Sequence, residues 1–117
     1  MSAASFKLNN LIAIVDVNNM QADGPSKSIL NFEPLVQKFE AFGWYVRRVD
    51  GNNVPALTKA FRLARATTEA RPRIIICDTK MGKGVDFLEA RERSHFLRVE
   101  PEEWSRAMAE LDAGMPT

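Results

Sequence analysis

The sequence predicts an α/β fold, a three-layer parallel sheet with flanking helices, and two observations lead to this prediction. Three apolar, β-branched runs each end in an acidic residue followed by a loop rich in Gly or Asn, at 11–19, 44–53 and 73–84. Helical hydrophobic patterns separate the runs, as is typical of parallel strands joined by crossover helices. Since the carboxyl ends of parallel strands share one edge, where open α/β sheets bind ligands, we expect any site at that edge.

The first half of the chain is expected to hold two strands and one helix. The first strand covers about 11–15, and an irregular segment rich in turn residues follows it at 21–26. Asn31 is the expected N-cap of a helix whose apolar residues recur at helical spacing and which Gly43 ends. The second strand then runs over 44–49.

A second helix should follow, capped by Asn52 or Asn53, with Pro55 in its first turn. Its narrow apolar stripe is expected to face the sheet. The stripe consists of Ala56, Leu57, Ala60, Phe61 and Ala64.

The last third of the chain predicts one strand, one loop and one helix. The strand covers 73–77, and a long loop covers 79–99. The final helix starts near Pro101, and its apolar face carries Trp104, Met108 and Leu111.

Composition favours one globular domain and excludes some classes of partner. The 117 residues should bury roughly two-thirds of the surface of the unfolded chain. Sixteen basic and fifteen acidic residues leave a net charge of +1, which is too balanced for a nucleic-acid interface. Cys77 is expected to be a small buried residue in a reducing compartment, and no run has the length of a membrane span. We therefore expect a cytoplasmic protein with no nucleic-acid or membrane partner.

The predicted helices are too few for the predicted sheet. A parallel sheet needs cover on both faces, which two helices and a tail provide poorly. The opening residues 1–8 also resemble the last turns of a helix without its start. We therefore expect the chain to be part of a domain.

Two loops could carry chemistry, and each also has a structural interpretation. Asn18 offers an amide oxygen next to backbone carbonyls, which are ligands that Mg²⁺ accepts, but Asn is also common in turns and caps. Asp16 at the strand end could equally accept hydrogen bonds from loop N–H groups. The Gly82-Lys83-Gly84 loop allows close approach of a ligand, although it lacks the spacing of a Walker A loop. His95 is the only histidine, which excludes a multi-histidine metal site.

A longer pattern resembles the second half of the thiamine-diphosphate signature of transketolases. The pattern starts with Leu-Asn-Asn-Leu-Ile-Ala-Ile-Val-Asp-Val-Asn-Asn-Met-Gln-Ala-Asp-Gly-Pro at 8–25 and continues at 39–44, 49–51 and 78–87. It covers nearly the whole chain in order. The chain is most similar to the diphosphate-binding, N-terminal subunit of bacterial split transketolases, and it resembles only the C-terminal portion of that subunit.

The resemblance implies roles for five residues. Asn18 matches the asparagine whose side chain ligates Mg²⁺, and Met20 matches the residue that gives the same ion a backbone carbonyl. Met81 matches an apolar residue near the cofactor, next to the cofactor-binding turn that begins at Gly82. His95 matches a histidine near the diphosphate and the transferred group, where it assists proton transfer.

The resemblance also implies a reaction and a missing part. The reaction is reversible transfer of a two-carbon ketol unit between ketose and aldose sugars, usually phosphorylated, with thiamine diphosphate and Mg²⁺ as cofactors. The Gly-Asp-Gly motif that supplies an aspartate ligand of Mg²⁺ belongs upstream of these residues, and the pyrimidine-binding domain is absent. Residues 1–117 are thus expected to be a partial diphosphate-binding domain, inactive alone, in a homo- or hetero-oligomer with a pyrimidine-domain subunit.

Two other interpretations remain open at this point. The chain could be a free-standing, non-catalytic α/β module that binds phosphate or serves only in assembly. A phosphoacceptor domain of the receiver type is a weaker variant, suggested by Asp16 at one strand end and Lys80 after another. It lacks the acidic pair expected at the end of the first strand.

Overall fold

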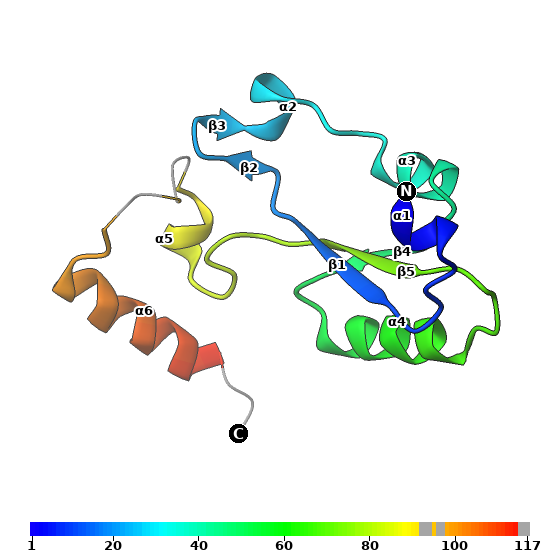
Figure 1. Ribbon diagram of the computed structural model, residues 1–117. Coiled ribbons are helices and arrows are strands. Elements are labelled where there is room, and N and C mark those ends of the chain that lie inside the picture. The colour runs from blue at the N-terminus through cyan, green and yellow to red at the C-terminus, as the bar shows by residue number, and fades with distance from the viewer. Residues whose placement is uncertain (92–94, 96–97, 115–117) are drawn as a thin grey trace.

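The fold is known from a computed structural model, which describes residues 1–91, 95 and 98–114. Three parallel strands form its main sheet in the order β1-β5-β4 (Figure 1). They are β1 (Ile12–Val17), β4 (Tyr45–Asp50) and β5 (Arg73–Asp78). Val17 and Asp50 both pair with Asp78, so the three carboxyl ends are level. The predicted parallel sheet is confirmed, and its strands extend one or two residues beyond the predicted ends.

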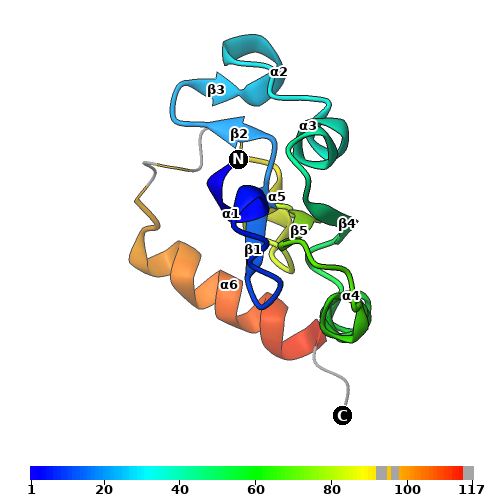
Figure 2. The same ribbon diagram turned by 45° about the vertical axis from the view of Figure 1, so that its right-hand side comes forward.

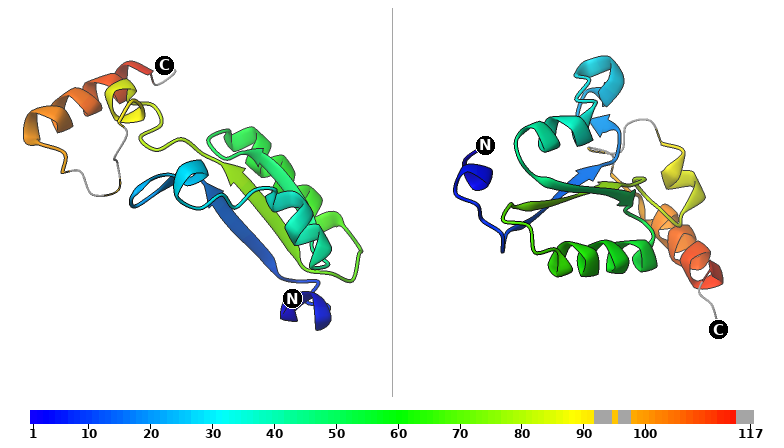
Figure 3. Two further views of the ribbon diagram at one scale, coloured as in Figure 1. Left: turned by 90° about the horizontal axis from the view of Figure 1, so that it is seen from above. Right: turned by 90° about the vertical axis from the view of Figure 1, so that its right-hand side faces the viewer.

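The central strand β5 is the most deeply buried element. Ile74, Ile75 and Ile76 are all buried, because the strand has a neighbour on each side and helices lie on both faces of the sheet (Figure 3). Such continuous apolar runs are typical of parallel strands covered on both faces. Cys77 is also buried, and this burial raises the pKa of its thiol, with smaller contributions from Asp16 and Asp78.

Helices cover the two faces of the sheet, as the three-layer prediction requires. Helix α4 (Val54–Ala66) lies on one face and α3 (Leu35–Ala41) on the other (Figure 3). Of the two predicted caps of α4, Asn52 and Asn53, the helix uses Asn53, whose side-chain oxygen accepts a hydrogen bond from the N–H of Ala56 at 3.0 Å. The small residues of its stripe let α4 approach the sheet closely. Ala60 and Ala64 pack with Ile75 and Cys77 in the core, with Leu57 and Phe61 at its margin.

The cover is incomplete on one side of the sheet. Helix α4 packs mainly on β4 and β5, and Ile14 of the edge strand β1 is 58% exposed on the α4 face. The radius of gyration is 17.5 Å, whereas about 13 Å is typical of a compact 100-residue domain. The expected poor cover is therefore confirmed.

Short elements surround the sheet (Figure 2). The segment that follows β1 contains a small hairpin of β2 (Met20–Gln21) and β3 (Gly24–Pro25), followed by α2 (Ser26–Ile29). The segment 21–26, which was predicted to be irregular, therefore contains part of a two-stranded antiparallel hairpin around the expected turn. The opening residues form a helical turn, α1 (Ser2–Ser5), as their pattern indicated.

The predicted start of α3 is wrong. Asn31 does not cap the helix, because its side-chain oxygen accepts a hydrogen bond from the N–H of Glu33 at 3.1 Å. The Glu33 carboxylate instead accepts from the N–H of Leu35 at 2.7 Å and supports the first turn. Residues that precede a proline disfavour helical backbone, so the helix begins only after Pro34.

The predicted loop over 79–99 is also partly wrong, because it contains the helical turn α5 (Asp86–Glu89). The final helix α6 (Pro101–Gly114) starts where the sequence predicts. The two helices are in contact: the N–H of Asp86 donates to the Glu110 carboxylate at 3.0 Å, and Arg106 lies 4.6 Å from the ring centre of Phe87. Together they project beyond the carboxyl ends of the strands (Figure 3). None of the helices in the described ranges has the length and apolarity that a membrane span requires.

Candidate functional site

Side-chain hydrogen bonds join the loops at the carboxyl edge of the sheet. Asp16 at the end of β1 accepts a hydrogen bond from the hydroxyl of Thr79, which follows β5. Asn52, which follows β4, accepts from the N–H of Lys80 at 2.8 Å. Asp50 in turn accepts from the N–H of Asn52 at 2.9 Å. The polar residues that follow the three strands thus meet at one edge, as predicted.

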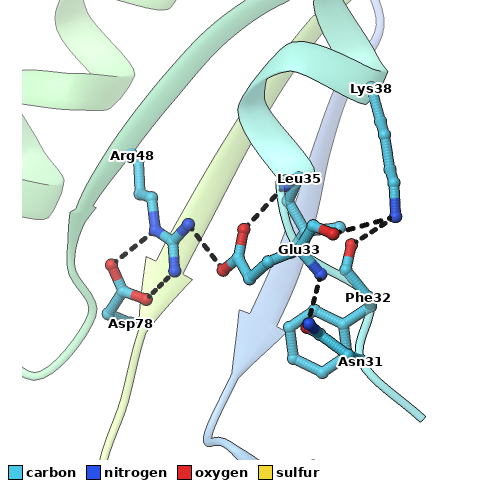
Figure 4. Close-up of polar contacts among 7 residues, drawn as sticks. All are labelled: Asn31, Phe32, Glu33, Leu35, Lys38, Arg48 and Asp78. Carbon is cyan, nitrogen blue, oxygen red and sulfur yellow. Dashed lines mark hydrogen bonds and ion pairs between the residues drawn. The ribbon is translucent and has the colours of Figure 1, made fainter. Parts of the chain in front are cut away.

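An ion-pair cluster lies beside this edge (Figure 4). Arg48 donates two hydrogen bonds to Asp78, at 2.8 and 2.7 Å, and contacts Glu33 at 2.8 Å. The backbone N–H of Leu35, with Arg48, lowers the pKa of Glu33, and the hydrogen bonds to Asp78 and Glu33 raise the pKa of Arg48. The cluster balances the charge of Asp78 and fastens the segment before α3 to the sheet.

The described part of the chain forms a polar cavity of about 510 Å³ at the same edge, beside β4 and β5. Of its lining residues, sequence reasoning had pointed only to Lys80, for the receiver variant, and to Lys83, in the loop at Gly82. The loops that supply them come together only in the folded chain. The lining residues are Asp50, Asn52, Asn53, Asp78, Thr79, Lys80 and Lys83.

The structure brings Asn18 and Met20 together in one tight turn after β1. The side-chain oxygen of Asn18 accepts a hydrogen bond from the N–H of Met20 at 2.9 Å, and Asn19 between them has a φ of 60°. The carbonyl of Asn19 accepts from the N–H of Ser26, which closes the hairpin. An amide oxygen has two lone pairs, so Asn18 keeps one for a further partner. The turn interpretation of Asn18 is therefore correct and is compatible with a ligand role.

The donor set fits only part of a magnesium site. Asn18 and Met20 offer neutral oxygens, which suit Mg²⁺ but supply no negative charge. Across residues 1–91, 95 and 98–114, no three His, Cys, Asp or Glu side chains are grouped so that they could hold a metal ion. The charge to balance a cation here would have to come from a phosphate or from groups outside these residues.

The predicted cofactor loop is held against α5. Gly82 has a φ of 69°, and a Cβ atom there would lie 2.6 Å from the Cβ and 3.0 Å from the carbonyl carbon of Leu88. Met81, beside it, is half-buried. The close packing gives Gly82 a structural role that the sequence did not indicate, and its cofactor role stays a prediction.

Glu89 of α5 fixes the same loop by charge. Its carboxylate contacts the amino groups of Lys80 at 2.6 Å and Lys83 at 3.3 Å, and accepts from the N–H of Gly84 at 2.9 Å. The hydrogen bond from Lys80 is the main cause that lowers the pKa of Glu89 to about 2, followed by that from Gly84.

This low pKa predicts an acid-sensitive contact. A carboxyl group with a lowered folded-state pKa stabilises the fold above its ordinary pKa near 4.5, and the stabilisation is lost as the pH falls towards 2. We expect the midpoint of thermal unfolding to fall less steeply between pH 4.5 and 2 in Glu89→Gln than in the wild-type chain. Glu102→Gln, at an exposed position of α6, is the control. Identical pH profiles of Glu89→Gln and wild type would contradict the assignment.

His95 is exposed. Its neighbours 92–94 and 96–97 lie outside the described residues. Its role in proton transfer stays a prediction.

The fold and its polar edge define an α/β domain of the class that binds ligands at the ends of parallel strands. Comparison with known proteins specifies the class further. The family model described as the thiamine diphosphate binding domain of transketolase matches residues 1–111. The chain therefore belongs to the transketolase family.

Individual relatives agree with this assignment. An uncharacterized transketolase family protein, y4mO, of Sinorhizobium fredii is 69% identical over 115 residues, which are 98% of this chain and 41% of the relative. A 6-deoxy-6-sulfo-D-fructose transketolase subunit of a Clostridium species is 38% identical over 112 residues, 96% of this chain and 40% of that protein. The chain thus spans about two-fifths of the length of these relatives.

A solved structure shows the same fold. The transketolase of Campylobacter jejuni superposes with a TM-score of 0.84 at 30% identity, over 95% of this chain and 17% of that one. The predicted fold class is confirmed.

Proposed function

We propose that this chain is part of a transketolase that depends on thiamine diphosphate and Mg²⁺ and transfers a two-carbon ketol unit between ketose and aldose sugars, usually phosphorylated. The observation that supports the proposal is the Asn18–Met20 turn at the carboxyl end of β1, in a chain of this family. The relative from Clostridium is itself called a transketolase subunit.

Each predicted residue has a distinct task in this proposal. The Asn18 side-chain oxygen and the Met20 carbonyl would hold Mg²⁺, which would balance part of the negative charge of the diphosphate. Met81 and Gly82 would pack beside the cofactor, which when bound supplies the electron sink for cleavage of a carbon–carbon bond. His95 would assist proton transfer at the transferred group.

The proposal requires protein outside these residues. We propose that residues 1–117 form part of the diphosphate-binding domain and that a pyrimidine-domain subunit completes the active site in a homo- or hetero-oligomer. The neutral donor set at Asn18 and Met20 supports this, because an acidic ligand is still needed. The chain alone is expected to be inactive. The proposed compartment is the cytoplasm, with which the free thiol of Cys77 is compatible.

A non-catalytic binding or assembly module is the alternative function. The polar cavity at the carboxyl edge, which Lys80 and Lys83 help to line, is compatible with phosphate binding by such a module. The receiver variant has less support, because Asp16 is already bonded to Thr79.

A chimera tests the proposed function. The segment of the Campylobacter jejuni transketolase that superposes on this chain is replaced by residues 1–117, because the two folds agree closely. We expect the folded chimera to transfer a ketol unit from a ketose phosphate to an aldose phosphate. A chimera that binds thiamine diphosphate but transfers nothing would favour the non-catalytic alternative.

The chimera also tests His95. We expect His95→Ala to lower turnover by roughly a hundredfold, the lower range of general acid–base contributions, with little change in cofactor affinity. A residue that only shaped the binding site would alter affinity as well. Turnover that is unchanged would remove His95 from the site.

A further inference from the structure

The amino-terminal edge of the sheet holds an arginine whose hydrogen-bonding capacity is mostly unused. Arg73, the first residue of β5, is only 5% exposed. One of its nitrogens, Nη2, donates to the carbonyl of Thr67 at 2.6 Å. Its Nε and Nη1 are buried without a hydrogen-bond partner, which leaves three N–H donors unused, one on Nε and two on Nη1.

This arrangement differs from that of Arg48. The guanidinium of Arg48 uses all three of its nitrogens, in contacts with Asp78 and Glu33. Arg73 has no carboxylate partner among the contacts of the described residues. A buried cation without a counter-charge is costly in free energy, so the environment of Arg73 favours entry of an anion.

A cavity of about 290 Å³ lies next to Arg73. Its volume corresponds to roughly ten water molecules at about 30 Å³ each. The exposed side chains around it belong to the loop before β1 and to α4, and they are amides and a second guanidinium. The lining residues are Asn9, Asn10, Ile12, Ala64, Arg65 and Arg73, with no carboxylate among them.

We propose that this cavity binds a small oxyanion, a carboxylate or a phosphate. The guanidinium of Arg73 forms the buried end of the site, and the exposed side chains of Arg65, Asn9 and Asn10 supply further N–H donors at its mouth. Movement of these exposed side chains admits the anion to Nε and Nη1 of Arg73. Arginine is well suited to both anions, because its planar N–H groups match carboxylate and phosphate oxygens.

The site is separate from the candidate cofactor site. Arg73 opens β5 at the amino-terminal edge, whereas Asn18 and the loop at Gly82 follow the carboxyl ends of the strands. The two proposals can therefore fail independently.

The first test follows the arginine side chains of the purified chain by nitrogen-15 NMR during titration with sodium acetate or sodium phosphate, with ionic strength held constant by sodium chloride. We expect the Nε–H resonance of Arg73 to shift saturably. The resonance of Arg62, an exposed arginine on α4 one turn before Arg65, should stay unchanged. A response to acetate alone assigns a carboxylate, and a response to phosphate alone assigns a phosphate. No saturable shift with either anion, or equal shifts at Arg62, would overturn the proposal.

Variants give a second, independent measurement. The effective anion should raise the thermal unfolding midpoint of the wild-type chain and of Arg62→Gln equally. Arg65→Gln, at the mouth of the cavity, should weaken the apparent affinity roughly threefold, which is within the range for an exposed charge contact. Arg73→Lys should abolish the anion-dependent rise of the unfolding midpoint. Should Arg73→Lys fail to fold, Arg65→Gln and the NMR titration still decide, because an unchanged affinity in Arg65→Gln contradicts the site.

Discussion

Asn18→Ala in the transketolase chimera is expected to weaken Mg²⁺-dependent binding of thiamine diphosphate roughly 10- to 100-fold. Removing a group that only orients a metal ligand typically weakens metal binding about 10- to 100-fold. Here the ligand itself is removed. The carbonyl of Met20 would remain as the second oxygen, but its turn would lose the hydrogen bond that the N–H of Met20 donates to Asn18. The dissociation constant is measured by calorimetric titration with Mg²⁺ in excess.

Asn31→Ala is the matched control for this substitution. Asn31 makes the same kind of turn, since its side-chain oxygen also accepts from an N–H two residues later, but it lies before α3 and has no proposed ligand role. We expect its effect on cofactor affinity to be within the error of the titration. Equal losses in the two variants would show that turn geometry, and not a metal ligand, accounts for the result.

Gly82→Ala is expected to lower the free energy of unfolding of the chain by about 2–5 kcal/mol. The left-handed backbone costs a side chain about 1–2 kcal/mol, and overpacking costs about 1–3 kcal/mol. The new Cβ would meet the Cβ and the carbonyl carbon of Leu88, and the backbone of α5 has little room to move because Glu89 ties it to Lys80. Urea denaturation measures the change.

Gly114→Ala provides the comparison. A Cβ at Gly114 has no atom within 4 Å, and the position ends α6. Alanine has the higher helix propensity, so this variant should be as stable as the wild-type chain or slightly more stable. If Gly82→Ala were as stable as the wild-type chain, Gly82 would have no packing role. Its proposed place beside the cofactor would then be the remaining reason for a glycine.

Most of the fold could be predicted from the sequence because the three strands are strongly marked. Each combines β-branched residues with an acidic end and a turn, and the buried stripe of α4 has clear helical spacing. The start of α3 could not be predicted, because an asparagine can either cap a helix or bond to its own loop, and Asn31 does the latter. Helix α5 has only 4 residues, which is too short for apolar residues to recur at helical spacing.

The candidate site was predictable only where its residues are neighbours in the chain. Asn18 and Met20 belong to one turn, so a local pattern was enough to place them together. The cavity lined by Asn52 and Lys80 depends on a hydrogen bond between residues 28 positions apart, which no local pattern contains. Arg73 gave no sequence indication either, because a charged residue at the start of a strand is normally at the surface.

Calorimetric titration of thiamine diphosphate into the chimera, once with Mg²⁺ and once with the metal removed by chelation, tests the central claim most directly. The claim is that this chain contributes the neutral oxygens of a Mg²⁺–diphosphate site. It predicts saturable binding with Mg²⁺ that is lost on chelation and regained when Mg²⁺ is restored. Binding of equal strength in the absence of Mg²⁺, or no binding by a folded chimera, would contradict it.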